Sequence, residues 1–207
     1  CKPMEYYQYD KKRTLVSSLF WHPLDTLNAS KKALIASIAT EQSCDLAVVR
    51  DSAIPQAGFA STDRDMRSGM VSIAAVVADA LEKEGLKSFL YAAQVDNSIW
   101  VCIGVYDGVI VIDRMGTDSQ IHALYHEQFA RSEWGSFFAP AHWDFANTVD
   151  KTFDEVLPHK GKRVHFPRST QLCEINTKLL RKKNVIGVLL LGLLMFGIHK
   201  GMTFWQE

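Results

Sequence analysis

The feature that most constrains this chain is an apolar stretch near its C-terminus, residues 185–205. Its first fourteen residues, 185–198, contain no charged or polar side chain. As an α-helix the whole stretch would be about 31 Å long, which matches the hydrocarbon core of a bilayer. Lys200 interrupts it only one turn from the far end, where a lysine can reach the lipid headgroups. We therefore predict a transmembrane helix over residues 185–205, with the apolar side chains of Val185, Leu189, Leu193 and Phe196 in the membrane and Trp205 as its interfacial anchor.

Basic residues stand immediately before this stretch and indicate its orientation. They are Lys178, Arg181, Lys182 and Lys183, with only Glu174 against them. Basic residues beside a membrane helix mark its cytoplasmic side, so we expect everything before the helix to be cytoplasmic. A buried core helix of a soluble protein is the alternative interpretation. It would accommodate the apolar residues, but it accounts neither for the basic residues before them nor for the aromatic end after them.

Charge is distributed unevenly along a chain whose formal net charge is zero. Residues 1–159 carry 14 basic and 21 acidic residues, whereas residues 160–183 carry eight basic residues and one acidic residue. An acidic body on a basic neck suits a domain held above an anionic inner leaflet. It argues against nucleic acid as a partner, since that would need the basic patch on the folded domain.

These patterns divide the chain into three parts. We predict a cytoplasmic domain over residues 1–168, a basic juxtamembrane neck over residues 169–184 and the membrane helix over residues 185–205. Because a protein rarely ends directly after a membrane helix, we also expect further chain in the periplasm. The four cysteines are scattered without a C-x-x-C pair, so no zinc site or redox pair is predicted, which fits a reducing compartment.

Hydrophobic periodicity in the first part predicts the element order β-α-β-α-β-β-β-α-β-α-β, a mixed α/β domain with an antiparallel meander in the middle. Asp107-Gly108 indicates a type I′ hairpin within the meander. Residues 51–67 are predicted to form an exposed loop. Strands are expected over residues 15–20, 46–49, 89–95, 99–106, 109–115, 137–139 and 163–166, and helices over residues 31–42, 68–84, 119–133, 148–157 and from Thr170 into the neck.

Few residues form a pattern that could carry chemistry. His122 and His126 lie four apart on a predicted helix, but the glutamate of an H-E-x-x-H zinc site is missing between them, so a solvated helix face is the better interpretation. Asp96 and Asp113 stand at strand ends, where an actin-like fold keeps its phosphate-binding hairpins. Such hairpins need a glycine next to the acid, and neither aspartate has one. No P-loop and no G-x-S-x-G motif occurs, so no catalytic, cofactor or metal site is predicted.

Four short motifs, followed by a basic neck and one membrane helix, resemble the PilO-type pilin accessory proteins of type IVb pili, to which the bundle-forming-pilus protein BfpC is related. The resemblance covers roughly residues 14–205. The motifs are LFWHPL at residues 19–24, GMVSIAA at 69–75, WVCIGVYDG at 100–108 and FAPAHW at 138–143.

This resemblance implies a degraded actin-like, that is ribonuclease H-like, cytoplasmic domain, similar to the cytoplasmic part of the L-type proteins of type II secretion. It implies a single-pass protein of the bacterial inner membrane, without catalytic residues or cofactor. Such a scaffold docks the cytoplasmic pilus assembly ATPase onto the polytopic platform protein of the inner membrane. It also contacts other alignment-complex subunits and is an oligomer within the machine.

Two other functions stay open. The first is a membrane-tethered actin-like ATPase with Asp96 and Asp113 near Mg-nucleotide. The second is a membrane-anchored sensor that reports the state of the periplasm through its helix, which the sequence does not separate from the scaffold.

Overall fold

The structure is a computed structural model that describes residues 4–175, except residues 26, 28 and 132. The predicted membrane residues Val185, Leu189, Leu193, Phe196 and Trp205 lie outside this part of the chain. So do the neck residues Lys178, Arg181, Lys182 and Lys183. Among the described residues, no helix is both long and apolar enough to cross a bilayer.

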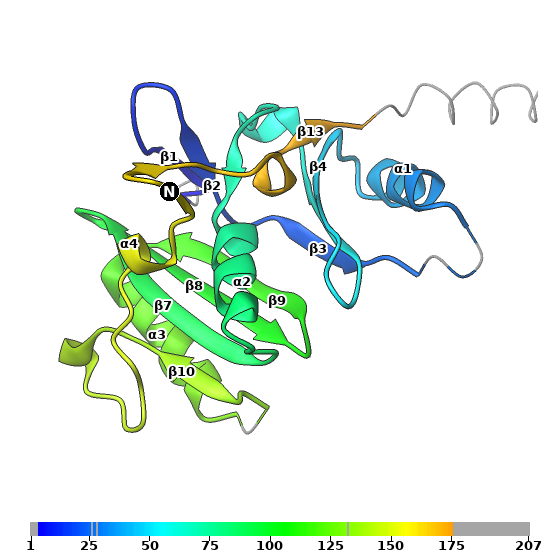
Figure 1. The fold of residues 1–207 in the computed structure, drawn as a ribbon. Coiled ribbons are helices and arrows are strands. Elements are labelled where there is room, and N and C mark those ends of the chain that lie inside the picture. The colour runs from blue at the N-terminus through cyan, green and yellow to red at the C-terminus, as the bar shows by residue number, and fades with distance from the viewer. Residues whose placement is uncertain (1–3, 26, 28, 132, 176–207) are drawn as a thin grey trace, which may run out of the picture.

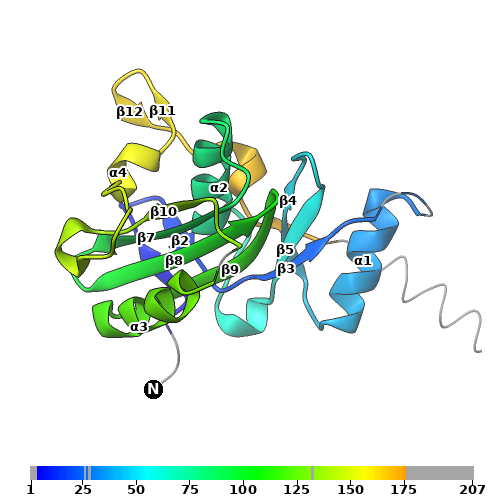
Figure 2. The same ribbon diagram turned by 90° about the horizontal axis from the view of Figure 1, so that it is seen from below.

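Two four-stranded sheets form the framework, and α2 (Ile73–Lys83) lies between them (Figures 1 and 2). Ala75 of α2 packs against the first sheet, whereas Val77 and Leu81 pack against the second. Every residue of α2 from Ile73 to Ala78 is buried, because the helix is covered on both sides. The first sheet has the order β13-β4-β5-β3, with β3 at Phe20–Pro23, β4 at Leu46–Arg50, β5 at Gln56–Ala60 and β13 at Cys173–Glu174.

The second sheet contains the predicted meander and has the order β10-β7-β8-β9. Asp107 and Gly108 have φ values of 47° and 80°, as a type I′ turn requires, so the hairpin prediction is confirmed. β10 runs parallel to β7. The strands are β7 at Phe89–Asp96, β8 at Ile99–Tyr106, β9 at Val109–Gly116 and β10 at Ser136–Phe138.

Two further helices cover the outer faces of the sheets. α1 (Lys31–Glu41) packs on the first sheet and begins at Ser30, whose side chain accepts a hydrogen bond from the Ala33 amide. α3 (Asp118–Phe129) packs on the second sheet and begins with a capping box formed by Thr117 and Gln120. Both helices begin where a side chain can accept a hydrogen bond from a free backbone amide of the first helical turn.

Smaller elements close the ends of the fold. The N-terminal strand β1 was not predicted, and it pairs with β2 in a three-stranded sheet of order β1-β2-β6. These elements are β1 at Tyr6–Gln8, β2 at Thr14–Val16, β6 at Val71–Ser72, α4 at Phe153–Val156, β11 at His159–Lys160 and β12 at Arg163–Val164, with 3-10 turns at Thr62–Arg64, Ala141–Trp143 and Arg168–Thr170.

The prediction of an exposed loop over residues 51–67 is wrong. β5 lies within this range, and all five of its residues are buried between β4 and β3. Gly58 is required there because a Cβ atom at this position would lie 2.9 Å from the Trp21 indole. The glycine that suggested a loop therefore marks a close approach of two neighbouring strands.

The predicted strand over residues 15–20 is broken into β2 and β3. Ser18 has a φ of 63°, and at this residue the chain turns from the three-stranded sheet, which contains β2, into the first four-stranded sheet, which contains β3. The predicted helix over residues 68–84 begins only at Ile73, because Val71 and Ser72 pair with β2. The helix predicted over 119–133 ends at Phe129, and that over 148–157 is reduced to α4.

The helix predicted from Thr170 is absent in the part of the chain that the structure describes, where the 3-10 turn Arg168–Thr170 is followed by extended chain. Leu172 is fully buried between α2 and the first sheet, and β13 pairs with β4. The globular domain therefore continues to Ile175, and residues 169–175 of the predicted neck belong to it.

Candidate functional site

Asp113 lies in the middle of β9 and is the most enclosed carboxylate of the described chain. Its Oδ1 accepts hydrogen bonds from the Ser17 hydroxyl and, at 2.9 Å, from the Ser18 amide. Its Oδ2 accepts bonds from the Leu19 amide at 3.2 Å and from the Trp21 indole at 2.9 Å. Burial raises the pKa of Asp113, although the hydrogen bonds that it accepts act in the opposite direction. Three of these partners lie in the segment that links β2 to β3, and Trp21 lies in β3 itself, so Asp113 of the second sheet fixes the point at which the chain enters the first sheet.

Asp96 occupies a different place. It ends β7 at the hairpin to β8, is exposed, and accepts a hydrogen bond from the Asn97 amide at 2.8 Å. It lines a cavity of about 440 Å³, whereas Asp113 lines a separate cavity of about 750 Å³ between β3 and β9. The two aspartates proposed to lie near one Mg-nucleotide are therefore not brought together.

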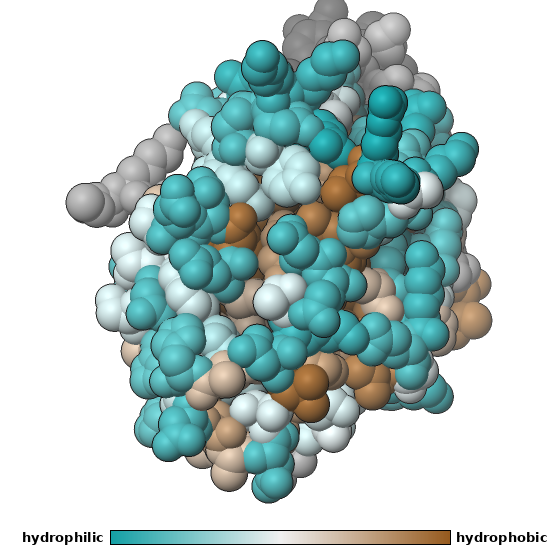
Figure 3. All heavy atoms as spheres, turned by 60° about the vertical axis from the view of Figure 1, so that its left-hand side comes forward, coloured by the Kyte–Doolittle hydropathy of each residue, from teal (hydrophilic) through white to brown (hydrophobic). Residues whose placement is uncertain are grey.

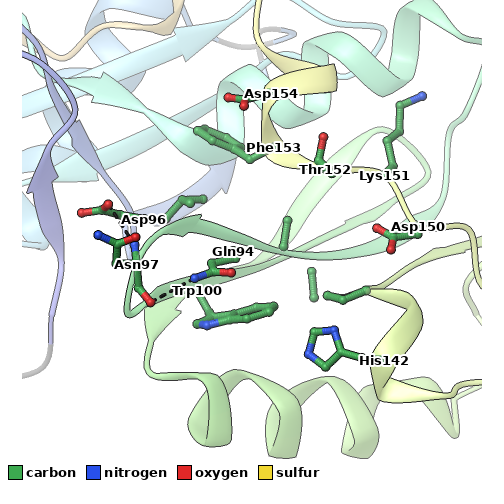
Figure 4. Close-up of a pocket in the computed structure, with 14 residues that line it drawn as sticks. Gln94, Asp96, Asn97, Trp100, His142, Asp150, Lys151, Thr152, Phe153 and Asp154 are labelled. Atoms are coloured by element: carbon green, nitrogen blue, oxygen red, sulfur yellow. Dashed lines mark hydrogen bonds between the residues drawn. The ribbon is translucent and has the colours of Figure 1, made fainter.

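The cavity at Asp96 lies beside β7 (Figure 4). Trp100 and Phe153 are its buried aromatic residues, and Ala92 and Ala93 belong to the strand that runs through it. Carboxylates of Asp96, Asp150 and Asp154 stand around it on exposed positions. From the side on which α4 lies, the surface shows a hollow with apolar side chains at its bottom and hydrophilic ones around it (Figure 3).

The histidine pair shares one face of α3, as its spacing indicates. His122 is half-buried, and its ring centroid lies 4.9 Å from that of Trp143 and 5.5 Å from that of Phe145. His126 is exposed, with its centroid 6.0 Å from that of Phe145. The face is thus partly covered by aromatic rings rather than fully solvated. Among the described residues, no group of three His, Cys, Asp or Glu side chains could hold a metal ion.

Two further buried polar side chains link the first sheet to its neighbours, one to the second sheet and one to α2. Gln56 of β5 donates to the Gly108 carbonyl at 2.7 Å and accepts from the Ile110 amide at 3.0 Å. Arg50 of β4 forms ion pairs with Asp79 at 2.9 Å and with Glu82 at 2.7 Å, both on α2. Sequence reasoning missed both contacts, because their partners lie 29 to 54 residues away.

The described chain thus forms a mixed α/β domain, and its fold is similar to that of the solved structure "Crystal structure of the cytoplasmic domain of BfpC". That structure matches with a TM-score of 0.58 at 17% sequence identity, over 79% of this chain and 94% of that chain. At this identity the likeness concerns the fold.

The chain itself belongs to the pilin accessory protein (PilO) family, whose sequence profile matches residues 15–207. The resemblance indicated by the four motifs is thereby confirmed. No curated protein sequence matches the chain significantly. Three of the motifs lie at the sites described above. Residues 19–24 supply Leu19 and Trp21 to Asp113, whereas residues 100–108 supply Trp100, and residues 138–143 supply Pro140 and His142, to the cavity beside β7.

Proposed function

We propose that this pilin accessory protein is a non-enzymatic scaffold of a type IVb pilus or type II secretion-like assembly machine. In this role it docks the cytoplasmic assembly ATPase onto the polytopic platform protein of the inner membrane. The proposal that the protein is not an enzyme rests on the hydrogen bonding of the Asp113 carboxylate. Its two oxygens accept four hydrogen bonds from the chain's own backbone and side chains, so the carboxylate serves the fold.

The strand order supports a degraded actin-like, ribonuclease H-like origin for the second sheet. In ribonuclease H-like domains, a three-stranded antiparallel meander is followed by a helix and by a fourth strand parallel to the first. Here the meander β7-β8-β9 is followed by α3 and by β10, which pairs in parallel with β7. Asn97 and Ser98 form the turn after β7, where a phosphate-binding hairpin would have glycine.

We further propose that residues 185–205 anchor the domain in the inner membrane with residues 1–175 in the cytoplasm. The basic residues of the neck then lie at the anionic surface of the inner leaflet. Fractionation should recover the chain in the inner membrane, and protease added to spheroplasts should leave residues 1–175 intact. Cleavage of that domain from the periplasmic side would contradict this orientation.

Affinity purification of the full-length protein from gently solubilised native membranes tests the docking role. We expect the assembly ATPase, the platform protein and other alignment-complex subunits in the eluate, because a scaffold holds these partners at once. Recovery of the folded protein alone, at good yield, would contradict stable docking. In that case a thermal shift of the protein with millimolar Mg-ATP, lost in Asp96→Asn, would favour the nucleotide-binding alternative.

A further inference from the structure

A short hairpin with a basic turn projects from the domain beside α4 (Figure 2). It is formed by β11 and β12, which pair at two positions, His159↔Val164 and Lys160↔Arg163. Every residue from His159 to Arg163 is exposed. Lys160 and Arg163 stand directly opposite each other, where like charges destabilise a strand pair. Within the described chain neither of them forms an ion pair, so the hairpin holds two neighbouring cations without a counter-ion.

A second basic turn, the one between β1 and β2, lies against this hairpin. Its Arg13 donates a hydrogen bond from Nη1 to the Val164 carbonyl at 2.9 Å. Lys11 and Lys12 precede Arg13 and are exposed, and the carboxylate of this turn, Asp10, is paired with Arg13. The two turns therefore form one surface, the two-hairpin patch. Its exposed cations, none of which forms an ion pair among the described residues, are Lys11, Lys12, Lys160, Lys162 and Arg163.

The two-hairpin patch lies on the side of the domain from which the chain leads toward the predicted membrane helix. β1 and β2 belong to the sheet β1-β2-β6, and Gln171, just before β13, forms a bridge with Val71 of β6. Figure 1 shows β1, β2 and β13 on the upper side of the molecule and β10 on the opposite side. Only residues 176–184 separate Ile175 from the predicted helix, and a stretch of that length spans about 30 Å at most. A domain anchored through this helix therefore stays close to the bilayer.

We propose that the two-hairpin patch binds the phosphate groups of anionic lipids at the inner leaflet. The lipid phosphates supply the counter-ions that Lys160 and Arg163 lack within the domain, and each further basic residue at such a surface adds to the attraction. The membrane anchor favours lipid phosphate over the phosphate of a nucleic acid, because it holds the patch beside the bilayer. This contact rests on the proposed anchor and goes beyond the contact of the neck, since it fixes how the folded domain is oriented on the membrane.

The test uses the full-length protein in nanodiscs of phosphatidylcholine alone or of phosphatidylcholine mixed with phosphatidylglycerol. A neutral N-hydroxysuccinimide ester acylates accessible lysines, and mass spectrometry gives the labelling rate of each lysine. The four lysines of the two-hairpin patch should react at least about threefold more slowly in the anionic discs, where lipid phosphates cover them. Lys83 and Lys87 are the internal controls, because they are exposed at and after the end of α2 that is remote from β6. They should react equally in both kinds of disc.

A double variant, Lys160→Glu/Lys162→Glu, shows whether the two turns bind the lipid as one surface. The hairpin should keep its structure, because a glutamate at position 160 would face Arg163 with the opposite charge. We expect the two lysines of the other turn to lose most of their protection in the anionic discs, because the changed hairpin is repelled by the lipid. The matched control, Lys83→Glu/Lys87→Glu, makes the same change of charge elsewhere and should leave that protection intact.

Each other outcome overturns a different statement. A chain that the nanodiscs do not retain would overturn the membrane anchor and the lipid contact together. A retained chain whose patch lysines react equally in both kinds of disc, or equal effects of the two double variants, would overturn the lipid contact and leave the anchor intact. Protection in native membranes that anionic discs do not reproduce would assign the patch to a protein or nucleic-acid partner, and would overturn the lipid contact as well.

Discussion

At the scale of single residues, Asp113 has a structural role that the sequence did not reveal. In the sequence its nearest following glycine is Gly116, three residues later, so no phosphate-binding hairpin is predicted there. In the fold its partners lie 92 to 96 residues earlier in the chain. No local pattern shows that the Ser17 hydroxyl, two amides and the Trp21 indole converge on one carboxylate. Such a site becomes visible only when the two sheets are placed together.

Asp113→Asn should lower the free energy of unfolding by about 2–4 kcal/mol. An asparagine keeps one acceptor oxygen, but its amide nitrogen would face donors, which leaves two buried N–H groups unsatisfied. Urea denaturation measures the change. Asp107→Asn is the control, since Asn-Gly also suits a type I′ turn, and it should stay within about 0.5 kcal/mol. Equal stabilities of the two variants would show that the bonds at Asp113 do not stabilise the crossing.

At the scale of elements, the sequence predicted the meander almost to the residue and missed β5 completely. β7, β8 and β9 are each eight residues long, β8 and β9 are rich in β-branched residues, and Asp107-Gly108 marks the turn between these two strands. β5 has the sequence QAGFA, whose small residues resemble a loop. These residues are small because Trp21 of the neighbouring strand covers Gly58. The strand conformation of β5 therefore depends on packing against its neighbouring strand, which the strand propensities of its own residues do not show.

Gly58→Ala should destabilise the domain by about 1–3 kcal/mol, because the new methyl group would lie 2.9 Å from the Trp21 ring and displace it. Displacement of the ring also strains its bond to Asp113. In a Trp21→Phe background the smaller ring leaves room, so the same substitution should cost less there. Thermal unfolding of the four proteins of this cycle measures the coupling. Identical penalties in both backgrounds would contradict the steric explanation.

The last described strand is a further element whose importance the sequence did not reveal. A chain ending at residue 168 lacks Leu172 and β13, whereas a chain ending at Ile175 retains both. Loss of a fully buried leucine typically costs about 2–5 kcal/mol, so the shorter chain should melt at a clearly lower temperature. Differential scanning calorimetry of the two chains makes the comparison. Equal melting temperatures would return the domain boundary to residue 168.

At the scale of the whole molecule, buried polar contacts hold the two sheets together alongside the apolar core. The side-chain amide of Gln56 forms hydrogen bonds with two backbone groups at the start of β9, as the backbone of a neighbouring strand would. Arg50 connects β4 to α2 through two carboxylates. Contacts of this kind fix the relative position of the sheets more specifically than apolar packing does, since each requires a matching partner.

Gln56→Leu should therefore cost about 2–4 kcal/mol, because the Gly108 carbonyl and the Ile110 amide would be left buried without partners. Hydrogen exchange should show the largest loss of protection at the Ile110 amide. Gln42→Leu, at an exposed position after α1, is the matched control and should change stability by less than about 0.5 kcal/mol. Uniform loss of protection over the whole domain would argue against a local role.

The position of β13 also determines how the domain responds to mechanical tension. A pull on the chain beyond Ile175 first reaches the bond from its amide to the Asp45 carbonyl, at 2.8 Å, then the two-residue pairing with β4 and then Leu172. These contacts are loaded one after another from the end, and only two register pairs join β13 to β4. The meander takes no part in this pathway, because its strands pair among themselves and with β10. Tension on the C-terminal side would therefore release β13 while the second sheet stays folded.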